Sequence, residues 1–162
     1  MNIIVMVDSN WGMSCKGRPI ASIPAEKKSR MQEIAGHVVV YDLKAMEELP
    51  GQQPVTGCTN IIFTDGINRT VRGAKTFTDL ASLKAELAGY DSDDIYIISS
   101  EKLYREFLPE TKTVHVTKID YVYAADSFFE NLDKNEDFLI TADSDEQYCF
   151  DIVYNFLKYE RR

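Results

Sequence analysis

The sequence is poor in the residues that form disulfides or bind metals. Its 162 residues include three cysteines and two histidines. The cysteines are odd in number and widely spaced, and no Cys-x-x-Cys pair occurs, so neither a disulfide framework nor a zinc site is indicated. We therefore expect reduced thiols, as in a reducing compartment, and no bound metal.

Basic side chains and long apolar runs are also scarce. Lys and Arg total 18 against 26 Asp and Glu, which gives a formal net charge of −8. Such a chain lacks the basic surface that displaces counterions from nucleic acid or docks on anionic lipid. No apolar run approaches the roughly 18 residues of a membrane span, and residues 1–8 show neither a basic leader nor a cleavage site. We expect a cytoplasmic protein with no nucleic-acid or membrane partner.

The remaining composition is that of one ordinary globular domain. Apolar residues make up 44% of the chain and charged residues 27%, close to the averages of roughly 45% and 25% for folded domains. Repeats, low-complexity tracts and linkers are absent. We therefore expect residues 1–162 to form a single domain with its own core, acting as a monomer on a small molecule.

Strands and helices alternate along the first two thirds of the chain. Apolar runs predict strands at residues 3–7, 38–41, 60–64 and 95–98. A shorter run predicts an edge strand at residues 75–77. Capping residues and apolar spacing predict helices at residues 24–35, 43–49, 80–88 and 99–107. Residues 8–22 are predicted as a loop.

From Thr113 onward the pattern contains strands alone. They are predicted at residues 113–117, 138–141, 148–153 and 156–159, with the last two as an antiparallel pair. The order predicts an α/β fold with a mixed sheet, mostly parallel in its centre, antiparallel at its C-terminal edge and covered by helices on both faces. Ligands of such sheets bind outside the carboxyl ends of the strands, so the residues that follow Val7, Tyr41, Thr64 and Ile98 are of interest.

Several segments of the chain match one family in order and spacing. They read IVMVD at 4–8 with GM at 12–13, IPAE at 23–26, GCTNII at 57–62 and YREFLP at 104–109, with VTKID at 116–120, YCF at 148–150 and YERR at 159–162 in support. Through these segments the chain resembles the dihydrofolate reductase family from end to end. The resemblance implies an eight-stranded mixed sheet and NADPH-dependent reduction of dihydrofolate or a related pterin.

The resemblance also implies a substrate site. Glu26 matches the carboxyl that hydrogen-bonds the pterin ring and helps protonate N5 while NADPH delivers hydride to C6, and Thr117 matches the threonine that hydrogen-bonds this carboxyl. Cys58 takes the position of the arginine that grips the glutamate tail of folate. The implied substrate contacts are Ile4, Val5, Met6, Arg30, Leu49, Ile98 and Thr117.

Two of these residues have simpler interpretations. Glu26 also suits the first turn of a helix, where the macrodipole favours an acid. Arg30, at the family's position for an inward aromatic residue, either lies on a solvated helix face with Lys27 and Lys28 or points inward. In the second case it would lower the pKa of Glu26 and favour the ionised form.

The implied cofactor site departs most from the family. Its expected members are Ser14, Leu43, Lys44, Ala45, Ser99, Ser100 and Tyr104. Where the family has Gly-Arg-x-Thr, the chain has Asp42 to Ala45, so an acid that would repel a phosphate replaces the glycine, and Lys44 alone offers a new positive charge. The family's Gly-Gly pair is Ser99-Ser100, which otherwise suits a helix N-cap. Ser14 replaces a glycine, and Ala21 a tryptophan, in the loop that closes over the nicotinamide.

Two main hypotheses follow. In the first, the chain is a divergent reductase with an NADPH site rebuilt around Lys44 and the Ser99-Ser100 turn. In the second, it is a non-catalytic ligand-binding protein that has lost the NADPH site. The first predicts an open groove beside Lys44, whereas the second predicts that this groove is filled, for example by Tyr41 or residues 14–21. A third hypothesis is a riboflavin-pathway deaminase-reductase, but the sequence shows no extra phosphate-binding cluster to support it.

Overall fold

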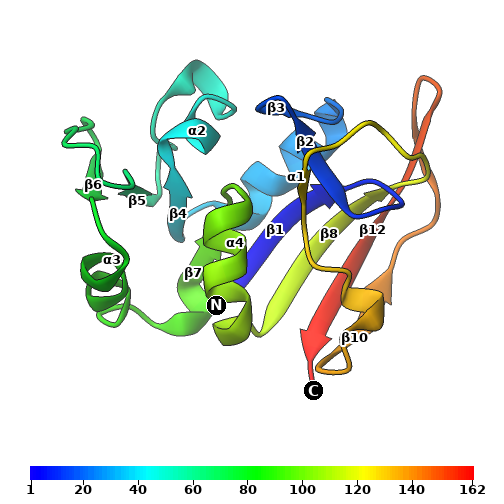
Figure 1. Ribbon diagram of the computed structural model, residues 1–162. Helices are drawn as coiled ribbons and strands as arrows, with labels where there is room; N and C mark the ends of the chain where they lie inside the picture. The colour runs from blue at the N-terminus through cyan, green and yellow to red at the C-terminus, as the bar shows by residue number, and fades with distance from the viewer.

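A mixed sheet runs through the computed structural model, which describes residues 1–162 (Figure 1). Eight of its strands lie in the order β10-β12-β8-β1-β7-β4-β5-β6, and β11 pairs only with β12. The strands of the sheet are β1 (Asn2–Val7), β4 (Val38–Asp42), β5 (Thr59–Phe63), β6 (Ala74–Phe77), β7 (Ile95–Ile97), β8 (Thr113–Ile119), β10 (Phe138–Asp143), β11 (Gln147–Cys149) and β12 (Ile152–Arg161). The neighbouring strands β8, β1, β7, β4, β5 and β6 pair in parallel. Strand β12 pairs antiparallel with β8, β10 and β11. The predicted mixed α/β fold is therefore confirmed.

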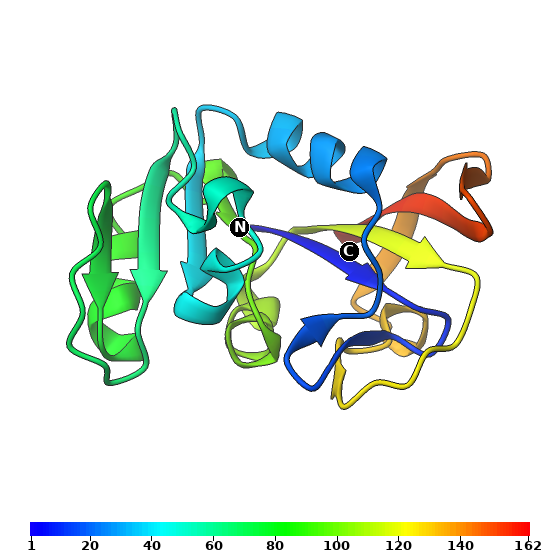
Figure 2. The same cartoon turned by 90° about the horizontal axis from the view of Figure 1, so that it is seen from above.

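Helices cover both faces of this sheet, as expected. Their bounds are α1 (Pro24–Ile34), α2 (Leu43–Met46), α3 (Leu80–Leu87) and α4 (Glu101–Phe107). Figure 2 shows α1 on one side of β1 and α4 on the other. Single 3₁₀ turns at Pro50–Gln52, Ser92–Asp94, Leu108–Glu110 and Leu132–Lys134 complete the connections. None of the helices has the length and apolar character needed to cross a membrane.

The core divides into two layers because the central strands are buried on both faces. Alternate residues of β1 show the division: Ile3 and Val5 join the larger cluster beneath α3 and α4, whereas Ile4 joins the cluster beneath α1 and α2. Val40 and Val39 in β4 divide in the same way. This two-sided burial explains why the strands read as continuous apolar runs rather than as alternating ones.

The prediction of a plain loop at residues 8–22 is wrong in part. This segment contains β2 (Gly12–Cys15) and β3 (Arg18–Pro19), which form a second sheet in the order β3-β2-β9 with β9 (Ser127–Phe128). The carboxylate of Asp8 organises the turn before β2, because it accepts hydrogen bonds from the backbone N–H groups of Asn10 and Gly12, at 2.9 and 2.8 Å. The strands are too short and polar to show a period of two.

The C-terminal strands also differ in their bounds. Residues 148–153 and 156–159 are not the two members of a pair, because β12 runs without a break from Ile152 to Arg161 and forms its hairpin with β11. Polar Asn155 interrupts the apolar pattern inside β12, where its side chain donates a hydrogen bond to the carbonyl of Ser144 at 2.9 Å. The predicted helix over residues 43–49 is shorter, since α2 ends at Met46.

Candidate functional site

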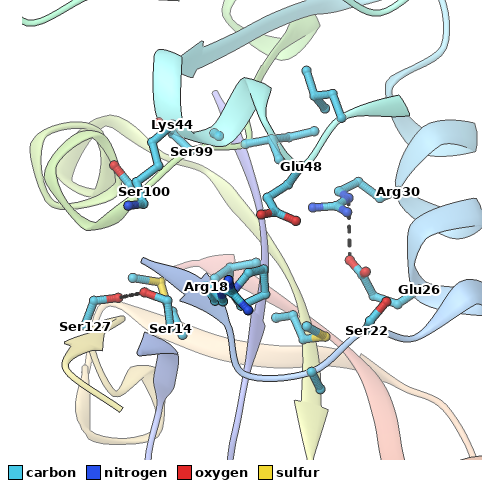
Figure 3. A pocket seen from close by; sticks show the side chains of 18 of the residues that line it. Ser14, Arg18, Ser22, Glu26, Arg30, Lys44, Glu48, Ser99, Ser100 and Ser127 are labelled. Atoms are coloured by element: carbon cyan, nitrogen blue, oxygen red, sulfur yellow. Dashed lines mark hydrogen bonds and ion pairs between the residues drawn. The ribbon is translucent and has the colours of Figure 1, made fainter. Parts of the chain in front are cut away.

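A cavity of about 520 Å³ lies beside the carboxyl ends of β1 and β7, between α1, α2 and the β2–β3 hairpin (Figure 3). Most of the residues expected at the site line it. These are Val5, Met6, Ser14, Glu26, Arg30, Lys44, Ala45, Leu49, Ile98, Ser99, Ser100 and Tyr104. The fold therefore brings together side chains that lie up to a hundred positions apart in the sequence.

Three expected members lie elsewhere. Ile4 is buried in the sheet, and its carbonyl accepts a hydrogen bond from the Tyr104 hydroxyl at 2.7 Å. Leu43 packs against the core cluster beneath α2 rather than lining the cavity. Thr117 lines a second cavity, of about 370 Å³, on which Glu26 also borders. No hydrogen bond joins Thr117 to the Glu26 carboxyl, so the contact implied by the resemblance is not made in this structure.

Glu26 lies in the first turn of α1, a helix that begins at Pro24, where the missing N–H of proline is not needed. The residue is 4% exposed. Its carboxyl accepts no hydrogen bond from the chain, and its one ion pair joins Oε1 to Arg30 Nε at 3.6 Å. Burial raises the pKa of Glu26, while the charges of Arg30 and Lys27 oppose that shift. The expected lowering by Arg30 is present, but desolvation outweighs it.

Arg30 points into the cavity (Figure 3) rather than out to solvent with Lys28. This is the inward of the two orientations that the sequence allowed. Its Nε is buried and has no hydrogen-bond partner. A buried donor without a partner costs about 1–3 kcal/mol, and more when it is charged. The ion pair with Glu26, at 3.6 Å, offsets part of this cost.

The lining of the cavity is more basic than the protein. Four basic side chains and two acidic ones face it: Arg18, Lys27, Arg30 and Lys44 against Glu26 and Glu48. The whole chain carries a net charge of −8. An electron-rich or anionic ligand is therefore favoured here, since a concave site concentrates its own field.

Sequence reasoning missed Arg18, Glu48 and Ser127 as lining residues. Arg18 belongs to β3, within the segment predicted as a loop, and Ser127 belongs to β9, which was not predicted. The hydroxyls of Ser14 and Ser127 form a hydrogen bond at 2.6 Å (Figure 3). The only signal in the sequence was a basic residue next to Gly17, and that is too common to indicate a site.

At the positions where the resemblance places cofactor phosphates, the Asp42 carboxylate accepts hydrogen bonds from neighbouring residues. Its Oδ1 accepts a hydrogen bond from the Ala45 N–H at 2.8 Å, and its Oδ2 accepts one from the Ser100 hydroxyl. The Asp42 N–H in turn donates to the Ser99 Oγ at 3.1 Å. Ser100 stands at the N-cap position of α4, as expected, but its hydroxyl does not cap that helix.

Lys44 lies close to the hairpin. A Cβ added to Gly17 would collide with the Lys44 ammonium, so this amine packs directly on the Gly17 backbone, whose φ is +76°. Tyr41 does not fill the groove, because it is fully buried and its hydroxyl donates to Asn60 Oδ1 at 2.9 Å. Lys44, Ala45, Ser99 and Ser100 line the open cavity, and the Asp42 carboxylate lies behind Ala45 and Ser100.

The family profile described as dihydrofolate reductase matches residues 1–161. The chain belongs to the dihydrofolate reductase family. It is 28% identical over 100 residues to the dihydrofolate reductase of Mycobacterium leprae and 26% identical over 99 residues to that of Neisseria gonorrhoeae. The matches cover 60% and 61% of this chain, and 59% of each relative.

A solved structure is similar over almost the whole chain. The dihydrofolate reductase from Enterococcus faecalis, complexed with NADP(H) and RAB-propyl, superposes with a TM-score of 0.82, covering 99% of this chain and 95% of that one at 16% identity. At this identity the likeness establishes the fold. For a member of the dihydrofolate reductase family, Asp42 is then the departure with the largest chemical consequence. The residues at the phosphate positions do not fit a dinucleotide held in the family's manner, since a fixed carboxylate already accepts their hydrogen bonds.

Proposed function

We propose that the cavity binds a pterin-like heterocycle through Glu26. The supporting observation is that this carboxyl is buried, faces the cavity and accepts no hydrogen bond from the chain. The amino group and adjacent ring N–H of a 2-amino-4-oxo ring form a pair of donors that match the two oxygens of one carboxylate. A buried carboxyl that accepts no hydrogen bond is costly even with an ion pair at 3.6 Å, so Glu26 favours a ligand that supplies donors.

The protonation of Glu26 supports a role in acid catalysis as well as binding. Burial raises its pKa, so the carboxyl holds its proton to a higher pH than an exposed glutamate does. A carboxyl of this kind can donate to a ring nitrogen as a general acid. Arg30, 3.6 Å away, limits the shift and stabilises the anion that remains after the proton has left.

Reduction of dihydrofolate or a related pterin by NADPH is the activity that family membership favours. Glu26 would supply the proton for such a reaction. The hydride would come from the cofactor, and we assign no residue to that step because the phosphate positions do not fit. Family membership alone supports this half of the proposal.

The geometry around Asp42 favours a second candidate, a ligand-binding protein that keeps the pterin site and does not use NADPH. The groove beside Lys44 is not filled by Tyr41, but both oxygens of the Asp42 carboxylate accept hydrogen bonds from the donors that a phosphate would use. Both candidates use the same Glu26 cavity. They differ in whether NADPH is consumed.

The ligand is better described as a related pterin than as folate with its glutamate tail. Cys58 stands where the resemblance places the arginine for that tail, and its thiol donates to the carbonyl of Ile34 at 3.2 Å. Basic groups lie instead within the cavity, Arg18 and Arg30 among them. We therefore propose a pterin whose acceptor or anionic groups lie close to the ring.

Calorimetric titration tests the proposal. The wild-type chain, Glu26→Gln and the control Glu47→Gln would each be titrated with folate and with 6-carboxypterin. Glu47 is an exposed residue at the end of α2 that does not line the cavity. We expect the wild type and the control to bind 6-carboxypterin, and Glu26→Gln to bind about 100-fold more weakly, since two charge-assisted hydrogen bonds are weakened.

The same samples separate the two candidate functions. Consumption of NADPH with dihydrofolate, followed by absorbance, supports the reductase, and its loss in Glu26→Gln assigns the proton donor. Ligand binding without NADPH consumption supports the binding protein. Absence of pterin and folate binding by the folded wild type would show that the proposal is wrong. Cytoplasmic location and the monomeric state stay predictions from the sequence.

A further inference from the structure

The ends of β4 and β7 form the part of the site where the parallel sheet offers its carboxyl edge. The two strands are neighbours, with Val40 opposite Ile97. Asp42 is the last residue of β4 and caps α2, and Ser99-Ser100 leads from β7 into α4. Two helices thus begin side by side at this edge, where open α/β sheets bind ligands.

The Asp42 side chain joins these two helix starts. One carboxylate oxygen accepts the Ala45 N–H of α2, and the other accepts the Ser100 hydroxyl before α4. A phosphate bound at this edge would use the same donors, because an anion at a helix start accepts backbone N–H and hydroxyl groups. The carboxylate therefore takes over the hydrogen bonds that an external anion would make.

No cation neutralises this carboxylate. The ten ion pairs of the chain include neither Asp42 nor Lys44. Lys44, the residue expected to replace the family's arginine, lines the cavity with its amine against Gly17 and forms no ion pair with Asp42. A phosphate brought to this edge would meet a like charge a few ångströms away, within about one Debye length and only partly screened.

We infer that Asp42 is a resident anion, meaning a side-chain carboxylate that accepts the hydrogen bonds a ligand phosphate would accept and so excludes dinucleotides from this edge of the sheet. Exclusion has two causes, the occupied donors and the like charge. This inference concerns the phosphate side of the cavity and does not require that Glu26 bind a pterin. It favours the second candidate function, which does not use NADPH, over the reductase.

Removing the charge should admit the dinucleotide. Asp42→Asn keeps the shape of the side chain and an oxygen to cap α2, whereas the matched control Glu47→Gln removes one exposed charge from the same helix. Both full-length chains and the wild type would be titrated with NADPH in a calorimeter. We expect binding by Asp42→Asn to be at least about tenfold tighter than by the wild type or the control.

Two further variants separate charge from structure. Asp42→Ser removes the charge and retains a capping hydroxyl, so it should also gain NADPH binding. It provides the test if Asp42→Asn does not fold. Ser100→Ala removes a hydrogen bond to Asp42 but keeps the charge, and we expect no comparable gain. Thermal unfolding of each variant verifies that it is folded.

Three results would overturn the inference: micromolar NADPH binding by the wild type, no gain in either folded Asp42 variant, or an equal gain in the control. Pterin binding, measured on the same samples, answers a separate question. A chain that gains NADPH binding in Asp42→Asn but never binds a pterin would support the resident anion and contradict the proposed function.

Discussion

Two carboxyl groups, one lining the cavity and one behind its lining residues Ala45 and Ser100, show how the same chemical group can bind a ligand or replace one. Glu26 stands in the first turn of α1, and Asp42 caps α2. The Glu26 carboxyl accepts no hydrogen bond from the chain, whereas both oxygens of Asp42 accept one. A buried acid with free oxygens can bind a ligand, and an acid whose oxygens are already used replaces one. The number of free acceptors, not the residue type, distinguishes the two.

The largest expected effect tests whether the two sides are independent. Glu26→Gln should weaken pterin binding about 100-fold, while Asp42→Asn should change it less than about threefold, because Asp42 does not line the cavity directly. Calorimetry with 6-carboxypterin measures both. Equal losses in the two variants would mean that the cavity acts as one unit and that the comparison fails.

For the free energy of unfolding, substitution of Asp42 should have a larger effect than substitution of Glu26. Asp42→Ala removes the cap of α2 and the bond to Ser100, and it should lower the free energy of unfolding by about 1–2 kcal/mol. Glu26→Gln removes no hydrogen bond within the chain and should change that free energy by less than about 0.5 kcal/mol near pH 5. At this pH a smaller fraction of the Glu26 carboxyl is ionised than at neutral pH. Urea denaturation supplies both values. A larger loss from Glu26→Gln would indicate a structural role that the contacts do not show.

Much of the fold follows from local patterns in the sequence. Residues 38–41 and 95–98 read as apolar runs because β4 and β7 are buried on both faces, and Asp79 signals the start of α3, where its carboxylate accepts the Ser82 N–H at 2.7 Å. The β2–β3 hairpin gives no such signal, because its strands are short and are held by distant residues such as Ser127.

Most of the residues expected at the site line one cavity, but their contacts could not be predicted. The position of Asp42 indicates that a phosphate would be repelled, but its bond to Ser100 spans 58 positions and depends on the pairing of β4 with β7. The orientation of Arg30 could not be decided either, since a helix with Lys27 and Lys28 nearby allows a solvated face as well as an inward one. Packing of α1 over the sheet decides it.

The pH dependence of stability distinguishes Glu26 from an ordinary surface acid. Burial raises its pKa in the folded state above that of the unfolded chain. The stability that its protonated form contributes is present below the unfolded pKa and is lost as the pH rises through the raised folded value. The free energy of unfolding of the wild type, relative to Glu26→Gln, should therefore fall as the pH rises above about 4, the ordinary range of a glutamate pKa.

Urea denaturation at several pH values measures this difference. Glu47→Gln, which removes an exposed charge outside the cavity, serves as the control. A difference between the wild type and Glu26→Gln that rises with pH would mean that Arg30 outweighs burial, and that Glu26 is held as an anion.

The smallest expected effect concerns Thr117, which the resemblance assigns to support Glu26. The structure contains no hydrogen bond between the two side chains, although both border the second cavity. Thr117→Val keeps the shape of this 5% exposed side chain and should change 6-carboxypterin binding less than about threefold, or less than about 0.7 kcal/mol. A loss of tenfold or more would show that a ligand draws the Thr117 hydroxyl onto the Glu26 carboxyl. In that case the free acceptors of Glu26 would be a feature of the ligand-free cavity alone, and the contrast with Asp42 would hold only before the ligand binds.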